Sequence, residues 1–262
     1  MLEIVGLTKR FGGLLAVNSV DFAVEPGEVV SLVGPNGAGK TTVFNLVTGV
    51  LWPDAGKVWF NGTDVTGLAA HRRARLGMAR TFQNIRLFSH LNALENVMVG
   101  LVSQGRAGVL ASLACTRAER TERRDLIEHA ERLLDWVGVG DNRFRLPGHL
   151  PYGDQRKVEI ARALGLKPKL LILDEPTAGM VAKEAHGVID LIAQLRATGV
   201  ALLLIEHNMN VVMAASDRIV VISSGAKIAE GPPAAIRADP QVIEAYLGTE
   251  DDDAEGDAEG EE

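Results

Sequence analysis

Hydrophobic and polar positions alternate in the first 65 residues with the period of two that is typical of β-strands. The alternating segments are 2–11, 16–24 and 56–62, and Gly-Gly, Pro-Gly-Glu and Asn-Gly sequences that favour turns lie beside them. Segment 28–33, EVVSLV, is instead almost continuously apolar, which is the pattern of a strand buried on both faces. We therefore predict a β-rich N-terminal part that contains one fully buried strand.

The middle of the chain, from about 91 to 139, changes to a helical pattern. Apolar side chains recur there with helical spacing among charged ones, most clearly at Leu126, Ala130, Leu133, Leu134 and Val137. Alternation of strands and helices then returns, with strands expected at 169–175, 200–207 and 217–225 and a helix over 183–199 that ends at a glycine. The pattern predicts a parallel α/β core with an inserted helical lobe.

A further helix is predicted over 150–164, LPYGDQRKVEIARAL. One side of it is apolar, with Val158, Ile160, Ala161 and Leu164 at helical spacing. Its start is unusual, because Pro-Tyr-Gly-Asp leads into basic residues. The first N–H groups of a helix have no partner within the helix and carry a partial positive charge, so this end favours an anion.

Composition places the chain among globular proteins with a substantial core. Of its 262 residues, 47% are hydrophobic and 23% are charged. The longest apolar run, 199–205, is far shorter than the roughly 18 residues needed to cross a bilayer, so we expect any membrane role to be peripheral. The single cysteine, Cys115, excludes an internal disulfide and suits a reducing compartment.

The net charge of −7 comes from the end of the chain. Residues 250–262 hold nine acidic and no basic side chains, so that residues 1–249 carry +2. We predict that 250–262 is a disordered, solubilising tail, with a regulatory contact as the alternative. The rest of the chain has no basic stripe interleaved with aromatic residues, which argues against sequence-specific binding of nucleic acid.

The segment GPNGAGKT, residues 34–41, follows the buried strand and precedes a helical pattern. It fits the phosphate-loop pattern G-x-x-x-x-G-K-T in the required strand–loop–helix context. Glycines let successive backbone N–H groups surround phosphates, Lys40 adds a charge at the β and γ oxygens, and the Thr41 hydroxyl can bind Mg²⁺. The context disfavours the alternative, a glycine turn that arises by chance.

The segment KLLILDE, residues 169–175, predicts the other half of a phosphate-hydrolysing site. Asp174 at the end of a buried strand can hold Mg²⁺, and Glu175 can orient or deprotonate an attacking water. Taken alone, the two acids could simply cap a helix. Their position after a strand of the same α/β core favours hydrolysis.

Three features together carry a family resemblance: the phosphate loop, the segment ILDEPTAG and the helix at 150–164. With them, the chain resembles the ATPase subunits of ATP-binding cassette (ABC) transporters over residues 1 to about 249. Segments 80–100, 203–213 and 242–248 are most similar to the subunits of branched-chain amino acid importers. The resemblance implies an α/β P-loop cassette with an N-terminal antiparallel β subdomain. Its core would comprise 1–88 and 165–249, and its helical subdomain 89–164.

The resemblance also implies the roles of individual residues in binding ATP and Mg²⁺. The nucleotide would be held by Phe11, stacked on adenine, and by Gly34, Pro35, Asn36, Gly37, Ala38, Gly39, Lys40, Thr41 and Thr42. Thr41, Gln83 and Asp174 would bind the metal, and Glu175, His207 and Gln83 would be catalytic. Taken as bare sequence features, Phe11 could be a core or turn aromatic, Gln83 a surface residue and His207 a capping or core histidine.

In this family the start of the helix at 150–164 faces ATP bound to a second ATPase subunit, so Tyr152, Gly153 and Asp154 would bind nucleotide across a dimer interface. Two positions depart from the family pattern. Asp154 replaces a glutamine, and Val181-Ala182 replaces Asn-Pro after the two acids. Both departures put the rate of hydrolysis in question.

The implied function is an ATPase that energises import, at the cytoplasmic face of the cell membrane. Its partners would be permease subunits, a second identical or related ATPase subunit and, indirectly, a solute-binding protein, with no nucleic acid. Alternatives are an ATPase for another small solute and an ATP-gated dimerising module with weak turnover. A soluble cassette of DNA repair or translation ranks last, because the chain has one phosphate loop and no sustained heptads.

Overall fold

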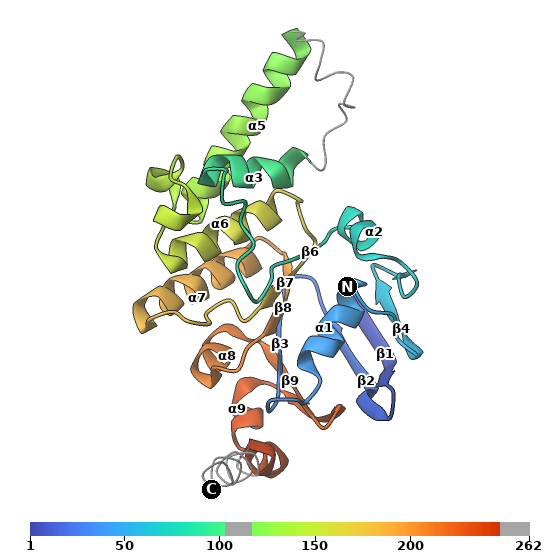
Figure 1. The fold of residues 1–262 in the computed structure, drawn as a ribbon. Helices are drawn as coiled ribbons and strands as arrows, with labels where there is room; N and C mark the ends of the chain where they lie inside the picture. The colour runs from blue at the N-terminus through green and yellow to red at the C-terminus, as the bar shows by residue number, and fades with distance from the viewer. Residues whose placement is uncertain (103–116, 247–262) are drawn as a thin grey trace, which may run out of the picture.

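The computed structural model describes residues 1–102 and 117–246, which fold into two β-sheets and the helices around them (Figure 1). The acidic tail at 250–262 and Cys115 lie outside the described residues. None of the helices in the described ranges is long and apolar enough to cross a membrane.

The larger sheet has six strands in the order β10-β9-β3-β8-β7-β6. Neighbours from β9 to β6 pair in parallel, and β10 pairs antiparallel with β9. All five residues of each central strand, β3, β7 and β8, are buried, as their continuous apolar sequences require. The strands are β3 (Val29–Val33), β6 (Met78–Arg80), β7 (Leu170–Asp174), β8 (Ala201–Ile205), β9 (Arg218–Ser223) and β10 (Ala226–Gly231).

The smaller sheet is antiparallel, with the order β2-β1-β4-β5. Its strands are β1 (Leu2–Phe11), β2 (Leu14–Val24), β4 (Ala55–Phe60) and β5 (Thr63–Asp64). Alternate side chains such as Leu2, Ile4 and Phe60 face a shared core with α1 (Lys40–Thr48) and one face of the larger sheet. The helix that follows the phosphate loop is therefore enclosed between the two sheets (Figure 1).

A second core joins the other face of the larger sheet to the helical lobe. Leu134 of α5, Ile160 of α6 and Ile192 of α7 are buried in it together with Leu171 and Leu204 of the sheet. In Figure 1, α3 and α5 lie at one end of the molecule, and α6 lies between them and α7. The helices are α2 (Ala70–Arg75), α3 (Ala93–Val102), α5 (Arg117–Trp136), α6 (Tyr152–Leu164), α7 (Ala182–Ala197), α8 (Met209–Ala215) and α9 (Pro233–Arg237), with short 3-10 turns η1 (Gly140–Asn142) and η2 (Pro147–His149).

The predicted fold class, a parallel α/β core with an antiparallel N-terminal sheet and an added helical lobe, is confirmed. The elements β5, β6, β10, α2, α8 and α9 were not predicted. All but β10 have two to seven residues and lack a clear periodic signal, whereas β10, AKIAEG, has no buried residue and no regular alternation of apolar and polar positions. The strand expected at 200–207 ends at Ile205, which leaves Glu206 and His207 in the following loop. The division into subdomains at 88–89 and 164–165 stays a prediction.

One buried cation connects α2 to the end of α1. The Arg73 side chain is 1% exposed and donates hydrogen bonds to the carbonyl oxygens of Leu46, Val47, Thr66 and Leu68 at 2.6–2.9 Å. The Leu46 and Val47 carbonyls lie in the last turn of α1, where helix carbonyls lack partners and attract a positive charge. Burial lowers the pKa of Arg73 to about 10, so the guanidinium stays charged at neutral pH.

We expect Arg73→Met to lower the free energy of unfolding by about 3 kcal/mol, because it leaves buried carbonyls without donors. Arg72→Met on the exposed side of the same helix is the matched control, and it should change stability by less than about 0.5 kcal/mol. Urea denaturation of both variants measures the difference. Equal stability of the two variants would contradict the structural role of Arg73.

Candidate functional site

The candidate site lies where three neighbouring parallel strands end. Strand β3 leads into the phosphate loop at 34–41, β7 ends at Asp174 with Glu175 next, and β8 is followed by Glu206 and His207. Parallel strands carry their carboxyl ends to the same edge of a sheet, so these three segments meet. The backbone N–H of Glu175 donates to the Ile205 carbonyl at 2.8 Å and joins two of them directly.

The phosphate loop is held tightly between two strands. A side chain at Gly34 would lie 2.0 Å from the Ile222 carbonyl oxygen of β9, and one at Gly39 would lie 2.4 Å from the Ala16 carbonyl oxygen of β2. Lys40 turns back into the loop, where its ammonium donates to the carbonyls of Gly34 at 2.6 Å and Pro35 at 2.7 Å. Burial lowers the pKa of Lys40, and the nearby Glu175 carboxylate opposes that shift.

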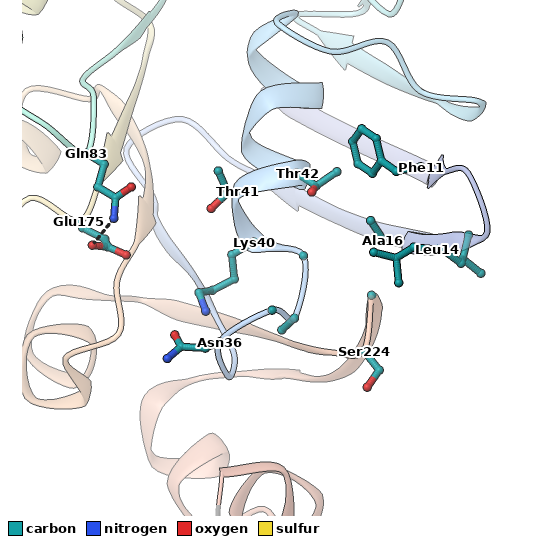
Figure 2. A pocket seen from close by; sticks show the side chains of 15 residues that line it. Phe11, Leu14, Ala16, Asn36, Lys40, Thr41, Thr42, Gln83, Glu175 and Ser224 are labelled. Carbon is teal, nitrogen blue, oxygen red and sulfur yellow. Dashed lines mark hydrogen bonds between the residues drawn. The ribbon is translucent and has the colours of Figure 1, made fainter. Parts of the chain in front are cut away.

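A cavity of about 660 Å³ extends from this loop. Figure 2 shows Lys40 and Thr41 in its centre, with Phe11, Leu14 and Ala16 on one side and the acid–amide pair of Glu175 and Gln83 on the other. Of the predicted residues, the cavity is lined by Phe11, Asn36, Gly37, Ala38, Gly39, Lys40, Thr41, Thr42, Gln83 and Glu175. Gly34, Pro35, Asp174 and His207 are not among the lining residues, although each adjoins one of them in sequence or by contact.

Three predicted catalytic residues from separate segments meet at the edge of this cavity. Gln83 Nε2 donates to Glu175 Oε2 at 3.1 Å, and His207 Nδ1 lies 3.7 Å from Glu175 Oε1. Glu175 adopts a left-handed backbone conformation with a φ of 44°, which is rare for a residue with a side chain. Such a conformation persists only where its surroundings impose it, and it clusters at functional sites.

Asp174 is more enclosed than Glu175. It is 8% exposed, and its backbone N–H donates to the Thr81 hydroxyl at 3.3 Å. Burial, reinforced by the neighbouring negative charge of Glu175, raises the pKa of Asp174 to about 6, while Arg80 opposes the shift. A divalent cation bound beside this carboxylate would favour its ionised form and so lower its pKa.

The residues predicted to bind nucleotide across a dimer lie elsewhere, at the start of α6. Tyr152 is 39% exposed, and Pro151 at the N-cap makes no side-chain capping hydrogen bond. A side chain at Gly153 would contact Glu184 of α7 at 3.4 Å. The Asp154 carboxylate accepts a hydrogen bond from Asn142 Nδ2 at 3.1 Å, so the residue that departs from the family pattern has a partner within its own helical lobe.

The structure adds a buried carboxylate that the sequence analysis missed. Glu206 is fully buried and accepts hydrogen bonds from both the N–H and the hydroxyl of Thr177 and from the N–H groups of His207 and Asn208. It thereby connects the loop after Glu175 to the loop that carries His207. The available signal was an acid that directly follows the apolar run ending at Ile205.

The cavity also has an unpredicted wall formed by Leu14, Leu15, Ala16, Ser224 and Gly225. Ser224 and Gly225 form the turn between β9 and β10, where both residues have a positive φ. The N–H of Gly225 donates to the Ala38 carbonyl at 3.1 Å, and its carbonyl accepts from Asn18 at 2.8 Å, so this turn supports the phosphate loop. Because β10 was not predicted, its turn could not be assigned to the site.

A glycine-rich loop between a central β-strand and a helix, with two acids at the end of a neighbouring parallel strand, defines a P-loop nucleotide-binding protein. The family model described as "ABC transporter" matches residues 17–178, and the one described as "Branched-chain amino acid ATP-binding cassette transporter" matches residues 226–252. The chain belongs to the ATP-binding cassette family of ABC transporter ATPases. The prediction of family and of ATPase activity from sequence is confirmed.

Two curated relatives and one solved structure give the degree of similarity. The chain is 49% identical to the high-affinity branched-chain amino acid transport ATP-binding protein BraF of Pseudomonas aeruginosa, over 95% of this chain and 98% of BraF. It is 44% identical, with the same coverage, to LivG of Escherichia coli (strain K12). An ABC transporter ATP-binding cassette in its ADP conformation superposes with a TM-score of 0.83 at 32% identity, covering 95% of this chain and 98% of that one.

The raised pKa of Asp174 predicts a pH-dependent stability for the protein without nucleotide and metal. Because the folded state favours the protonated acid, stability is lost as pH rises from about 4 to 6, and the cost persists above that range. We therefore expect Asp174→Asn to raise the free energy of unfolding at pH 8 by about 1 to 2 kcal/mol, with allowance for solvent screening.

The advantage of Asp174→Asn should shrink at pH 5, where part of the wild-type carboxyl is protonated. Asp190→Asn, at an exposed position of α7, is the matched control. Denaturant unfolding at the two pH values in the presence of a chelator measures both variants. An Asp174→Asn variant that is less stable than wild type at pH 8 would contradict the inferred cost of burying the Asp174 carboxylate.

Proposed function

We propose that this chain binds Mg²⁺–ATP in the 660 Å³ cavity and hydrolyses it to energise the uptake of branched-chain amino acids through a membrane permease. The observation that carries the proposal is the Glu175 carboxylate, which meets Gln83 and His207 at the edge of a cavity that also holds Lys40. A carboxylate in this place is suited to orient and deprotonate a water that attacks the terminal phosphate.

The residues available for Mg²⁺ are oxygen donors, as this cation requires. They are the Thr41 hydroxyl at the start of α1, the Gln83 amide and the Asp174 carboxylate. Within residues 1–102 and 117–246, no group of three His, Cys, Asp or Glu side chains could hold a metal. Mg²⁺ bound by these oxygen donors would neutralise charge on the phosphates.

The solute is inferred from the relatives. BraF and LivG are named as branched-chain amino acid transport proteins, and the family model for the same transporters matches residues 226–252. Uptake of labelled leucine into vesicles that hold this chain with its permease subunits and solute-binding protein tests the inference. Uptake of a different small polar solute, with no uptake of leucine, isoleucine or valine, would favour the alternative importer.

A groove of about 550 Å³ beside Gln83 supports contact with a permease. Its walls include Arg80, Phe82, Arg86 and Phe88 from the segment around Gln83 and Arg162 from α6 of the helical lobe. The guanidinium groups of Arg80 and Arg86 both contact the Phe82 ring, at 4.3 Å and 4.6 Å from its centre. We place the permease subunits here, with the ATPase at the cytoplasmic face of the membrane.

A second ATPase subunit completes the proposed site. Tyr152, Gly153 and Asp154 lie at the N-terminus of a 13-residue helix and do not line the cavity of their own chain. They would face the terminal phosphate of the other subunit, where unpaired helix N–H groups favour an anion. The neighbouring Val181 is 65% exposed and would lie at the same interface.

The second candidate function is an ATP-gated dimerising module in which turnover is incidental. The observations that favour it are the carboxylate of Asp154 and the apolar Val181 at the proposed interface. Turnover of the wild type, compared with that of Glu175→Gln, separates the two functions. We expect this variant to bind ATP normally, to accumulate as an ATP-bound dimer and to lose turnover by a factor of about 10² to 10⁴, the usual effect of removing a positioned general base.

Turnover of the purified complex with and without the substitution is the measurement, with Glu3→Gln on the exposed side of β1 as the matched control. Unchanged turnover in Glu175→Gln would remove Glu175 from the catalytic role. Negligible turnover in the wild type, combined with ATP-dependent dimerisation, would establish the gated module instead.

The charge of Asp154 should oppose dimer closure, because it is a like charge for the phosphates across the interface. Removing the charge should strengthen ATP-driven dimerisation and raise turnover severalfold. The repulsion that is removed amounts to about 1 kcal/mol at an effective dielectric near 20. Asp154→Asn is the sharper variant, since it removes the charge and can keep the hydrogen bond to Asn142. Asp154→Gln restores the family residue.

Both Asp154 variants should also lower the thermal stability of the nucleotide-free chain slightly, because a carboxylate near a helix N-terminus stabilises by roughly 0.3 to 1 kcal/mol. ATPase rates and the ATP-dependent increase in mass are the readouts. Slower turnover in both variants would show that the carboxylate assists the closed state.

A further inference from the structure

A buried ion pair attaches α6 to the segment that carries Gln83. The side chain of Arg156 is 0% exposed and that of Glu159 is 1% exposed, and they meet at 2.8 Å. Arg156 also donates through Nη1 to the Phe82 carbonyl at 2.6 Å and through Nη2 to the Gln83 carbonyl at 2.8 Å. Glu159 Oε1 accepts from the N–H groups of Phe82 and Arg86, both at 3.4 Å. The two side chains therefore bind donors and acceptors of the same loop.

Stability alone does not account for this pair. Taking two charges out of water is costly, and well-packed apolar residues of similar size often stabilise a protein at least as well. Arg156 Nε is moreover a buried polar atom with no hydrogen-bond partner in the described structure, which adds to the cost. Apolar side chains cannot set the position of the loop relative to the helix, because their packing is not directional. Hydrogen bonds to particular carbonyl and N–H groups can set it.

The pair lies between the two surfaces that the proposed function uses. On one side, Glu159 and Arg162 form part of the groove assigned to the permease, and Arg162 Nη2 is 3.8 Å from Glu159 Oε1. On the other side, Arg156 follows Tyr152 by one turn of the same helix, whose first residues face the second subunit. The Gln83 side chain, next to the carbonyl that Arg156 binds, contacts Glu175.

We propose that Arg156 and Glu159 are positioning residues that make the 82–86 segment and α6 move as one unit. A displacement of the groove by the permease is thereby transmitted both to Gln83 in this chain's cavity and to Tyr152–Asp154 at the other subunit's ATP. The inference rests on the proposed function, since it assigns the groove to a permease. The pair itself touches neither nucleotide nor solute.

The decisive variant replaces both members of the pair, as Arg156→Met together with Glu159→Leu. This change leaves no buried charge without its partner and is expected to preserve stability. The matched control is Arg143→Gln with Asp135→Asn, which removes the ion pairs of Arg143 with Asp135 at 2.9 Å and with Glu131 at 3.1 Å in the same lobe. The side-chain partners of Arg143 in the described structure are Glu131, Asp135 and Gly140, none of them in 82–86. Three properties are measured: the denaturant midpoint, amide hydrogen exchange of the full chain at 82–86, and ATPase activity of the complex with and without loaded solute-binding protein.

We expect amide exchange at 82–86 to accelerate at least tenfold in the double variant, while exchange within α6 is unchanged. Stimulation of ATPase activity by the loaded binding protein, expressed relative to each variant's own basal rate, should fall at least threefold. The control pair should alter neither. A double variant with wild-type stability, exchange and stimulation would overturn the proposal and show that the pair only fills space.

Two further comparisons keep the result interpretable. If the double variant does not fold, Arg156→Lys takes its place. The lysine ammonium can keep a positive charge near Glu159, but it cannot bind both carbonyls as a guanidinium does. Stimulation should therefore still fall. Full stimulation in Arg156→Lys would overturn the two-carbonyl attachment. A wild-type complex that is not stimulated at all would contradict the permease assignment, whereas the exchange measurement would still decide whether the pair holds the loop.

Discussion

The candidate site depends on one topological constraint, the parallel pairing of β3 with β8 and of β8 with β7. Because these strands are neighbours and run in the same direction, the loops that follow them emerge at one edge of the sheet. Lys40, Glu175 and His207 come from positions far apart in the sequence, and this pairing alone gives them a common neighbourhood. All fifteen residues of the three strands are buried, so the register is specified by the core on both faces.

Buried polar side chains then fix the paths of the loops that follow the strands. Strand pairing sets where a loop starts, but it does not set the path of the loop. Glu206 fastens the loop at Thr177 to that at His207, Arg156 fastens the Gln83 segment to α6, and Arg73 holds the end of α1. Each uses charge-assisted hydrogen bonds to backbone groups, which are directional in a way that apolar packing is not. Glu175, with its left-handed backbone, is oriented within this framework.

The fold class was predictable because the strong periodic signals were long. Nearly continuous apolar runs ending at Val33 and Leu173 predicted buried strands, and helical spacing within 150–164 predicted α6. Elements without such a signal were missed. The strand β6 has three residues, and the hairpin that joins β9 to β10 carries only a short turn signal, so Ser224 could not be placed beside the phosphate loop. The carboxylate of Asp154 was expected to act across an interface, and its hydrogen bond to Asn142 could not be foreseen across 12 residues.

The sequence by itself determined which chemistry is available: a phosphate loop, a pair of acids after a strand, and a helix that begins with Pro-Tyr-Gly-Asp. These are local patterns, in which a few neighbouring residues by themselves require a particular backbone conformation or a charged partner. Only the tertiary structure decided which distant groups meet, such as Gln83 with Glu175, 92 positions later, and Arg156 with the Phe82 carbonyl, 74 positions earlier. Buried hydrogen bonds between distant segments form only after the two cores have brought those segments together and excluded water. Periodicity along the chain therefore does not indicate which distant groups will be partners.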